Sequence, residues 1–376
     1  MLILTGIYCI PERNVSDTAI EGKPLRKRPA ICSGAAMPDA VLPAHFVPTA
    51  PTVFQYPEGW LEFVPVAGGF RVSLRPHQPG GFVALEDVVT WFPPDVVRGI
   101  AASHGFAWTA EVIARHQDPY YLERILKHQL YSYFPPSAFA GKRVLDFGCG
   151  TGASTFCLAH LLPDSHVTGV DFDETRLALA RRIAGIADLP NVSFLQSPSA
   201  LELPAALGSV DFVVMSAALQ HMLPLERRTV LPLLWKLLPA GGSLLINQTS
   251  HRWFPLEPDA SGLYLINYLP DGVAAFLARH FSSRDEEANR DRDLLELLRA
   301  GLRGASEREV LDLLPANTVV MQPVVQRSRA NYWKAGAFEP GLGFARAVAA
   351  EIFGWTDCRW GAVPSKHLDL VIRKHG

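Results

Sequence analysis

Short apolar runs alternate with amphipathic stretches from residue 143 to residue 249. Runs typical of buried strands stand at 143–148, 166–172, 191–196, 210–216 and 242–249. Between them, helical spacing of apolar residues predicts helices over 153–162, 173–187 and 225–238. Strands that alternate with helices at this spacing predict a mostly parallel sheet with helices on both faces.

The segments before this core have a different pattern. Residues 1–45 show no sustained period, and we expect a disordered or loosely attached tail, or an upstream start codon ahead of a natural start at Met37. Residues 46–139 form the predicted N-terminal extension. Within it, 52–85 has short apolar runs broken by Gly and Pro, which predicts a hairpin-rich segment. Helices are predicted over 93–105 and 109–134.

The segments after the core are less regular. We expect residues 251–345 to form a substrate loop and a helical cap, with amphipathic helices at 292–303 and 306–314. Residues 317–326 read as a strand. Residues 346–376 are predicted to give a C-terminal helix and a closing strand that returns to the core sheet as an antiparallel edge.

Composition narrows the class of protein. The 376 residues carry 35 Lys and Arg against 37 Asp and Glu, so no global positive field attracts nucleic acid or an anionic membrane. The five cysteines have no metal-ligand spacing, and the histidines have no suitable partners, so no metal site is expected. No apolar run is long enough to span a bilayer. We expect a cytoplasmic protein with reduced thiols, and a homodimer is left open.

Three alternating glycines follow the first core strand. Gly148, Gly150 and Gly152 allow a tight turn and a close approach of backbone to a ligand. Asp171 ends the second strand, where a carboxylate can accept both hydroxyls of a ribose. The turn also satisfies the permissive dinucleotide pattern, so NAD competes with a nucleoside such as S-adenosylmethionine. Asp146, at the end of the first strand, would repel a pyrophosphate but suits a cationic ligand.

The segments "VLDFGCGTG" and "VTGVDFD" resemble the first two signature segments of class I S-adenosylmethionine-dependent methyltransferases. "PAGGSLLINQ" resembles the strand-five segment of that family. The resemblance covers roughly residues 140–250 and the closing strand. It implies a Rossmann-like fold with a mostly parallel seven-strand sheet, S-adenosyl-L-methionine as cofactor, and methyl transfer as activity.

The resemblance also implies roles for single residues. Asp146 would face the methionine end, Asp171 would hold the ribose, and Phe172 would lie against the adenine. Where the family often has Gly-Asp-Ala after the third strand, this chain has Ser-Pro-Ser, so no carboxylate is available for the adenine there. The residues assigned to the cofactor are Asp146, Phe147, Gly148, Cys149, Gly150, Gly152, Asp171, Phe172, Ser197, Pro198, Ser199 and Ser216.

Candidate groups for the acceptor follow the fourth and fifth strands. His221 and His251 stand at the ligand-binding edge of such a sheet, where either could act as a general base or serve a structural role. The 251–270 loop mixes aromatic and polar residues, as substrate pockets do. The residues assigned to the acceptor are Tyr121, Trp253, Glu257, Tyr264, Asn267 and Tyr268.

These observations predict a methyltransferase that acts on a small-molecule, natural-product or glycan-type acceptor, with O-methylation favoured. An NAD-dependent oxidoreductase and a non-catalytic, methyltransferase-like partner protein remain as alternatives.

Overall fold

The computed structural model describes residues 51–117, 119–282, 286–324 and 367–376. The predicted tail at 1–45 and the predicted helix before the closing strand lie outside these residues. The boundaries predicted for the extension, core and cap therefore stay predictions at those ends.

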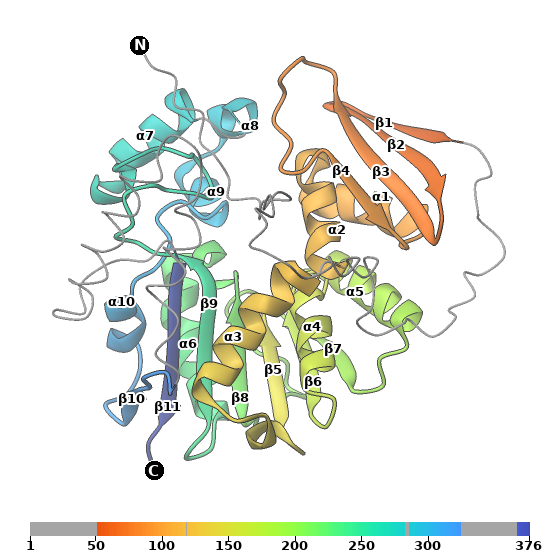
Figure 1. The fold of residues 1–376 in the computed structure, drawn as a ribbon. Coiled ribbons are helices and arrows are strands. Elements are labelled where there is room, and N and C mark those ends of the chain that lie inside the picture. The colour runs from red at the N-terminus through yellow and green to blue at the C-terminus, as the bar shows by residue number, and fades with distance from the viewer. Residues whose placement is uncertain (1–50, 118, 283–285, 325–366) are drawn as a thin grey trace, which may run out of the picture. The chain divides into compact units, whose positions relative to one another are not determined.

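Seven strands form the central sheet, in the order β10-β11-β9-β8-β5-β6-β7 (Figure 1). Five of them are parallel and match the predicted runs: β5 (Arg143–Phe147), β6 (His166–Asp171), β7 (Val192–Gln196), β8 (Phe212–Ser216) and β9 (Ser243–Ser250). This is the Rossmann-like, mostly parallel seven-strand sheet that the sequence predicts.

The closing strand β11 (His367–Lys374) pairs antiparallel with β9, as expected. Its expected place at the edge is wrong, because it also pairs with β10 (Thr318–Val320), which is the edge strand. Leu368, Leu370, Val371 and Ile372 are buried, and an edge position would expose one side of such an apolar strand.

Successive residues along the strands point to opposite faces of the sheet, and a hydrophobic core lies on each face. Leu145, Val213 and Ile246 pack with α6 (Pro224–Leu237) and α10 (Glu307–Asp312) on one face. Val144, Val214 and Leu245 pack on the other face. Their partners there are α3 (Arg124–Tyr133) and α4 (Ala153–Leu161). α5 (Glu174–Ala187) begins at Asp173, whose carboxylate accepts from the N–H groups of Thr175 and Arg176.

The N-terminal extension contains an antiparallel sheet in the order β1-β2-β3-β4. Its strands are Thr52–Tyr56, Gly59–Val66, Gly69–Pro76 and Asp87–Thr90, and the two-residue turn at 67–68 joins the second and third, in keeping with the predicted hairpin-rich segment. α1 (Pro94–His104) and α2 (Thr109–Gln117) pack against it and, through Phe156 and Ile183, against the core.

The helix predicted over 109–134 is interrupted. α2 ends at Gln117, a π-helical turn follows at Pro119–Glu123, and only then does α3 begin. Proline has no backbone N–H and is not accommodated inside a regular α-helix, so a break at Pro119 is expected.

The cap consists of the 251–270 loop and four helices, of which α7 and α9 share a small core with the loop. The helices are α7 (Asp271–Phe281), α8 (Glu286–Asp291), α9 (Leu294–Arg299) and α10. Arg303 holds the loop to α7: its guanidinium donates to the carbonyl oxygens of Ile266 (3.0 Å), Asn267 (3.1 Å) and Leu269, and Nε donates to Asp271 (2.9 Å).

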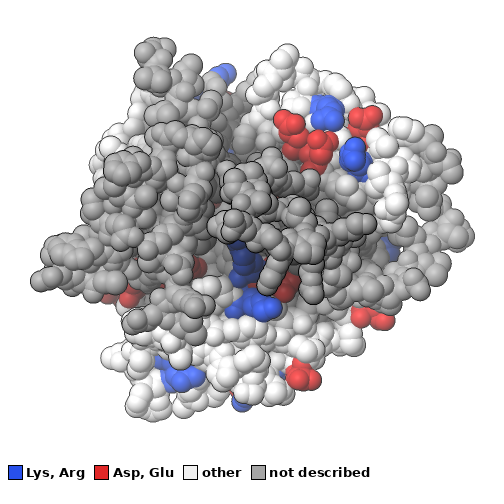
Figure 2. All heavy atoms as spheres, viewed as in Figure 1, with Lys and Arg blue, Asp and Glu red and all other residues white. Residues whose placement is uncertain are grey.

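Lys and Arg side chains are interspersed with Asp and Glu on the described part of the face in Figure 2. Among the described residues, no helix combines the length and the apolar character needed to cross a membrane.

Replacing Arg303 with Met should lower the free energy of unfolding by about 3 kcal/mol, because three carbonyl groups and the Asp271 carboxylate lose a buried cation. Urea denaturation measures this change. Arg308→Met is the matched control, since the Arg308 side chain is 90% exposed. Its expected effect is within about 0.5 kcal/mol. Equal effects of the two substitutions would contradict the proposed role of Arg303 as the organiser of the loop.

Candidate functional site

The glycine turn joins β5 to α4 at the carboxyl end of the sheet. Gly148 and Cys149 donate their N–H groups to the carbonyl oxygen of Val170 in β6, at 2.8 and 3.1 Å. A Cβ at Gly148 would lie 2.7 Å from the Cβ of Ala218, so the loop after β8 requires glycine there. Gly150 has a φ of +54°, and a Cβ built on it meets nothing within 4 Å. The backbone at Gly150 therefore borders open space, as a ligand cradle does.

Asp146 is fully buried beneath this turn. Its Oδ2 accepts hydrogen bonds from Ser154 Oγ (2.7 Å) and Thr155 Oγ1 (2.6 Å), both in α4, whereas Oδ1 has no partner among the described residues. Burial raises the pKa of Asp146 to about 6, opposed by the two hydroxyl donors. A carboxylate with one unpaired oxygen suits a cationic or hydrogen-donating ligand.

Asp171 ties the end of β6 to the turn. Its Oδ2 accepts from the N–H of Gly150 at 2.9 Å, and its Oδ1 accepts from the N–H of Asp173 at 3.0 Å. Each oxygen retains capacity for a second donor, so the carboxylate can also accept ribose hydroxyls. Phe172 beside it is 49% exposed, and the guanidinium of Arg299 lies 5.8 Å from its ring centroid.

The three residues after β7 differ in what they can offer an adenine. Ser197 is 2% exposed, and its N–H donates to the Asp171 carbonyl, while in the part of the chain that the structure describes its Oγ has no partner. The Oγ of Ser199 already accepts from the N–H of Leu201. Pro198 is exposed and has no donor. Ser197 is therefore the group of this segment best suited to replace the missing carboxylate.

The remaining residues assigned to the cofactor lie around the turn. Ser216 ends β8, buried, and its Oγ accepts from Gln248 Nε2 at 3.3 Å. Phe147 is half-buried, and burial raises the pKa of the Cys149 thiol, so that thiol stays protonated. The unpaired Asp146 and Ser197 oxygens and the open space at Gly150 together fit S-adenosylmethionine. A pyrophosphate would instead place charge beside two carboxylates.

His221 follows β8 in a short 3-10 turn (Leu219–His221). Its Nδ1 lies 2.9 Å from the carbonyl oxygen of Arg299, which can only accept, so Nδ1 carries the proton. Neighbouring atoms shield the ring from water, and this desolvation lowers the pKa of His221. Other parts of the residue remain exposed to solvent. A neutral ring with a protonated Nδ1 leaves Nε2 able to accept a proton.

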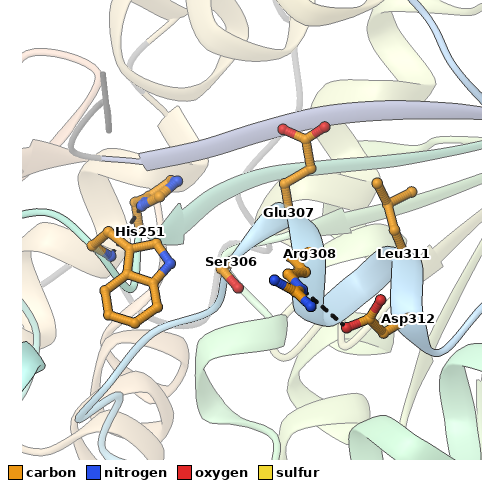
Figure 3. Close-up of a pocket in the computed structure, with 7 residues that line it drawn as sticks. His251, Ser306, Glu307, Arg308, Leu311 and Asp312 are labelled. Carbon is orange, nitrogen blue, oxygen red and sulfur yellow. Dashed lines mark hydrogen bonds and ion pairs between the residues drawn. The ribbon is translucent and has the colours of Figure 1, made fainter. Parts of the chain in front are cut away.

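His251 lies elsewhere. It directly follows β9, and its Nδ1 accepts from the N–H of Trp253 at 3.1 Å. Both line a cavity of about 380 Å³ with residues of the α10 region (Figure 3). There Arg308 forms an ion pair with Asp312 at 3.6 Å. No described residue assigned to the cofactor lines this cavity, so it does not join His251 to the glycine turn.

The residues assigned to the acceptor separate into two groups. Glu257 is 1% exposed and accepts from the N–H groups of Asp259, Ala260 and Ser261, so it shapes its own loop. Asn267 is also buried and donates to the Phe254 carbonyl at 3.1 Å.

The aromatic members of the loop face outward. Tyr264 is 68% exposed, and Trp253 and Tyr268 are each 48% exposed with ring centroids 6.1 Å apart. Tyr268 also donates its hydroxyl to the Trp253 carbonyl at 2.6 Å. Tyr121 belongs to the turn before α3 and donates its hydroxyl to Glu111 at 2.6 Å.

The sequence prediction missed two side chains that meet at this edge. Arg115 at the end of α2 donates through Nη1 to Gln248 Oε1 at 3.3 Å. They are 133 positions apart. Gln248 closes the strand-five segment that resembles the family, but the resemblance assigned no role to it, and Arg115 belongs to no such segment. Only the prediction that a helix precedes the first core strand pointed toward Arg115. Among the described residues, no group of three His, Cys, Asp or Glu side chains could hold a metal ion.

Comparison with known proteins gives a family match over the core. Residues 144–242 match the model of a methyltransferase domain. A demethylmenaquinone methyltransferase of Lactococcus lactis is 34% identical over 148 residues, 39% of this chain and 56% of the relative. One from Listeria welshimeri is 35% identical over 116 residues, 31% of this chain and 48% of the relative. The chain thus spans about half the length of these curated relatives.

Solved structures show partial likeness. TrmN from Thermus thermophilus is 33% identical over 30% of this chain and 34% of its own, with a TM-score of 0.27. The plantazolicin methyltransferase BpumL, in complex with SAH, is 13% identical. It covers 75% of this chain and 96% of its own, with a TM-score of 0.40.

The match over 144–242 coincides with the strands and turn that carry the unpaired Asp146 oxygen and the Asp171 carboxylate. On the sheet order, the glycine turn and this match, residues 144–242 are a methyltransferase domain of the class I, Rossmann-like, S-adenosylmethionine-dependent type.

Proposed function

We propose that this protein transfers a methyl group from S-adenosylmethionine to a hydroxyl-bearing small molecule. The observation that carries the proposal is the pair of carboxylates at neighbouring strand ends, Asp146 with an unpaired buried oxygen and Asp171 on the glycine turn. The curated relatives named for demethylmenaquinone favour an aromatic acceptor of the quinol type. Transfer to oxygen is our preferred form of the reaction.

The chain's residues then have distinct tasks. The bound cofactor supplies a methyl group already activated by a positive sulfonium. Asp146 offers negative charge to the cationic end, Asp171 holds the ribose, and Ser197 offers a hydroxyl to the adenine. His221, neutral and protonated at Nδ1, accepts the proton of the acceptor hydroxyl at Nε2. The exposed aromatic side chains of Trp253, Tyr264 and Tyr268 offer ring surface to an acceptor.

Calorimetry tests the proposal directly. Titration with S-adenosylhomocysteine should give saturable binding, and titration with NADH should give none. Binding of NADH without S-adenosylhomocysteine would favour the oxidoreductase alternative. Binding of neither ligand would favour the non-catalytic alternative.

Replacing His221 with Ala should lower kcat by about 100-fold or more, because the acceptor hydroxyl loses its base. His221→Asn should lose as much, although its amide can still donate to the Arg299 carbonyl. Affinity for S-adenosylhomocysteine should stay within about threefold in both. In the wild type, kcat should fall only below the usual histidine pKa of about 6.5, since dehydration lowers the pKa of His221. Full turnover in His221→Asn would assign His221 a structural role.

Replacing Asp146 with Asn should raise the free energy of unfolding and lower the affinity for S-adenosylmethionine. The pKa of Asp146 is about 6 in the folded state, above the unfolded value of 3.8. The protonated carboxyl therefore favours folding below pH 3.8, and this contribution to stability is lost as the pH rises through 6. The amide variant should therefore gain up to about 3 kcal/mol in unfolding free energy at pH 8, and little at pH 4.

The same variant should bind S-adenosylmethionine at least about tenfold more weakly at pH 8, because the cation loses its counter-charge. In the wild type, affinity should decline as pH falls below about 6, with Asp146 becoming neutral. Urea denaturation and calorimetry measure the two quantities. A variant that is less stable and binds equally well would overturn the assigned role of Asp146.

A further inference from the structure

The side-chain amide of Gln248 connects three elements at the carboxyl edge of the sheet. Its Oε1 accepts from Arg115 Nη1 in α2 at 3.3 Å, and its Nε2 donates to Ser216 Oγ at the end of β8, also at 3.3 Å. Its backbone carbonyl accepts from Gln220 Nε2 at 3.4 Å. These bonds are longer than the usual 2.9 Å, so a ligand oxygen could replace them at small cost.

The backbone at Gln248 is irregular in a way that β-strands seldom are. Gln248 has a φ of +52°, and the pairing of β9 with β11 shifts register at this point, where Leu368 pairs with Thr249 but Leu370 pairs with Ile246. Ala217, just past the end of β8, has a φ of +53° and donates its N–H to the Asn247 carbonyl at 2.9 Å. Left-handed residues other than glycine cost about 1 kcal/mol or more. Bulges of this kind redirect side chains beside active sites.

The place of Gln248 in the sheet separates it from the cofactor groups. Asp171 stands on β6 and Asp146 on β5, while Gln248 stands on β9, with β8 between β5 and β9. At roughly 4.8 Å per strand, the separation across the sheet is about 10 Å from Asp146 and about 14 Å from Asp171. Along the strands, the register sets Asp146 level with Leu245, so Gln248 also stands three residues farther toward the carboxyl edge than Asp146. Gln248 thus lies over the β8–β9 half of this edge, three strands away from the strand that carries Asp171.

Two adjacent residues of α2 contact different parts of the carboxyl edge of the sheet. His116 bonds through Nε2 to Thr151 Oγ1 of the glycine turn at 3.0 Å, whereas Arg115 reaches Gln248. α2 therefore spans the cofactor turn and the ends of β8 and β9.

The guanidinium of Arg115 is weakly neutralised among the described residues. Its contacts are the 3.3 Å bond to Gln248, a 3.8 Å ion pair with Glu111 and the ring of Tyr121 at 5.7 Å. Glu111 also accepts the Tyr121 hydroxyl at 2.6 Å. The Arg115 side chain is 21% exposed, and a guanidinium has five donors. The described residues therefore leave donors of this guanidinium available to an anionic oxygen.

We propose that Arg115 and Gln248 bind the hydroxyl oxygen of an aromatic acceptor and stabilise its phenolate form. The inference rests on the proposed function and names the chemical class of the acceptor: a phenol or quinol that presents an ionisable oxygen. The proton leaves that oxygen for Nε2 of His221, and the charge left on the oxygen is offset by the Arg115 guanidinium. Arg115 and Gln248 then fix the acceptor's orientation at the methionine end.

Calorimetry with matched probes tests the inference. With the protein saturated by S-adenosylhomocysteine, 1-naphthol should bind about tenfold more tightly than 1-methylnaphthalene, which has the same rings and no hydroxyl. Arg115→Met and Gln248→Leu should each bring this ratio close to one. Both should leave affinity for S-adenosylhomocysteine within about threefold, which also shows that the variants fold. Arg115→Lys, which keeps the charge without the planar fork, should retain part of the preference. Arg181→Met, at an exposed ion pair with Glu174, is the control for loss of a cation.

Two results would overturn the inference. One is a wild-type protein that binds S-adenosylhomocysteine but does not prefer 1-naphthol. The other is an Arg115→Met variant that keeps the preference and loses tenfold or more in affinity for S-adenosylhomocysteine, which would place Arg115 on the methionine carboxylate. A wild-type protein that binds no S-adenosylhomocysteine would instead overturn the proposed function itself.

Discussion

The N–H of Gly150 donates to Asp171 Oδ2, and the N–H groups of Gly148 and Cys149 donate to the Val170 carbonyl. These three bonds fix the turn after β5 against the end of β6. Since the turn leads directly into α4, they also determine where Ser154 and Thr155 stand, and those two hydroxyls are the only described donors to Asp146. The position of the buried carboxylate, and with it the charge of the site, therefore depends on the geometry of this turn.

Most of the core could be predicted from the sequence because each element there satisfies a local rule. The five parallel strands are apolar runs, and Asp173 caps α5 where acidic residues open the predicted helix. One error was local, because Pro119, which is visible in the sequence, breaks a helix that apolar periodicity alone would continue. The other arose where a distant partner decides. β11 lies inside the sheet because β10, three residues long, covers its outer edge.

The residues of the candidate site also fall into those that a local pattern predicts and those that distant contacts position. Asp146, Gly148, Gly150 and Asp171 lie within short segments whose spacing is visible in the sequence. Glu257, assigned to the acceptor from the loop's composition, is instead fully bonded inside its own loop. Gln248 attains its role through a bulge, and a bulge depends on the pairing of β9 with β11 across more than a hundred positions. The segment "PAGGSLLINQ" includes Gln248, but its local pattern does not reveal the bulge that directs the side chain.

Contacts between the cap and the core hold His221 in one tautomer. Arg299 of α9 forms an ion pair with Glu226, a buried residue of α6, and donates to the carbonyl of His221 at 3.3 Å. The carbonyl of Arg299 itself accepts from Nδ1 of the same histidine. Since the guanidinium also lies against the Phe172 ring, one cap residue touches both the proposed base and the predicted adenine surface. A change in the cap at α9 would therefore reach the chemistry through Arg299, without altering any residue of the glycine turn.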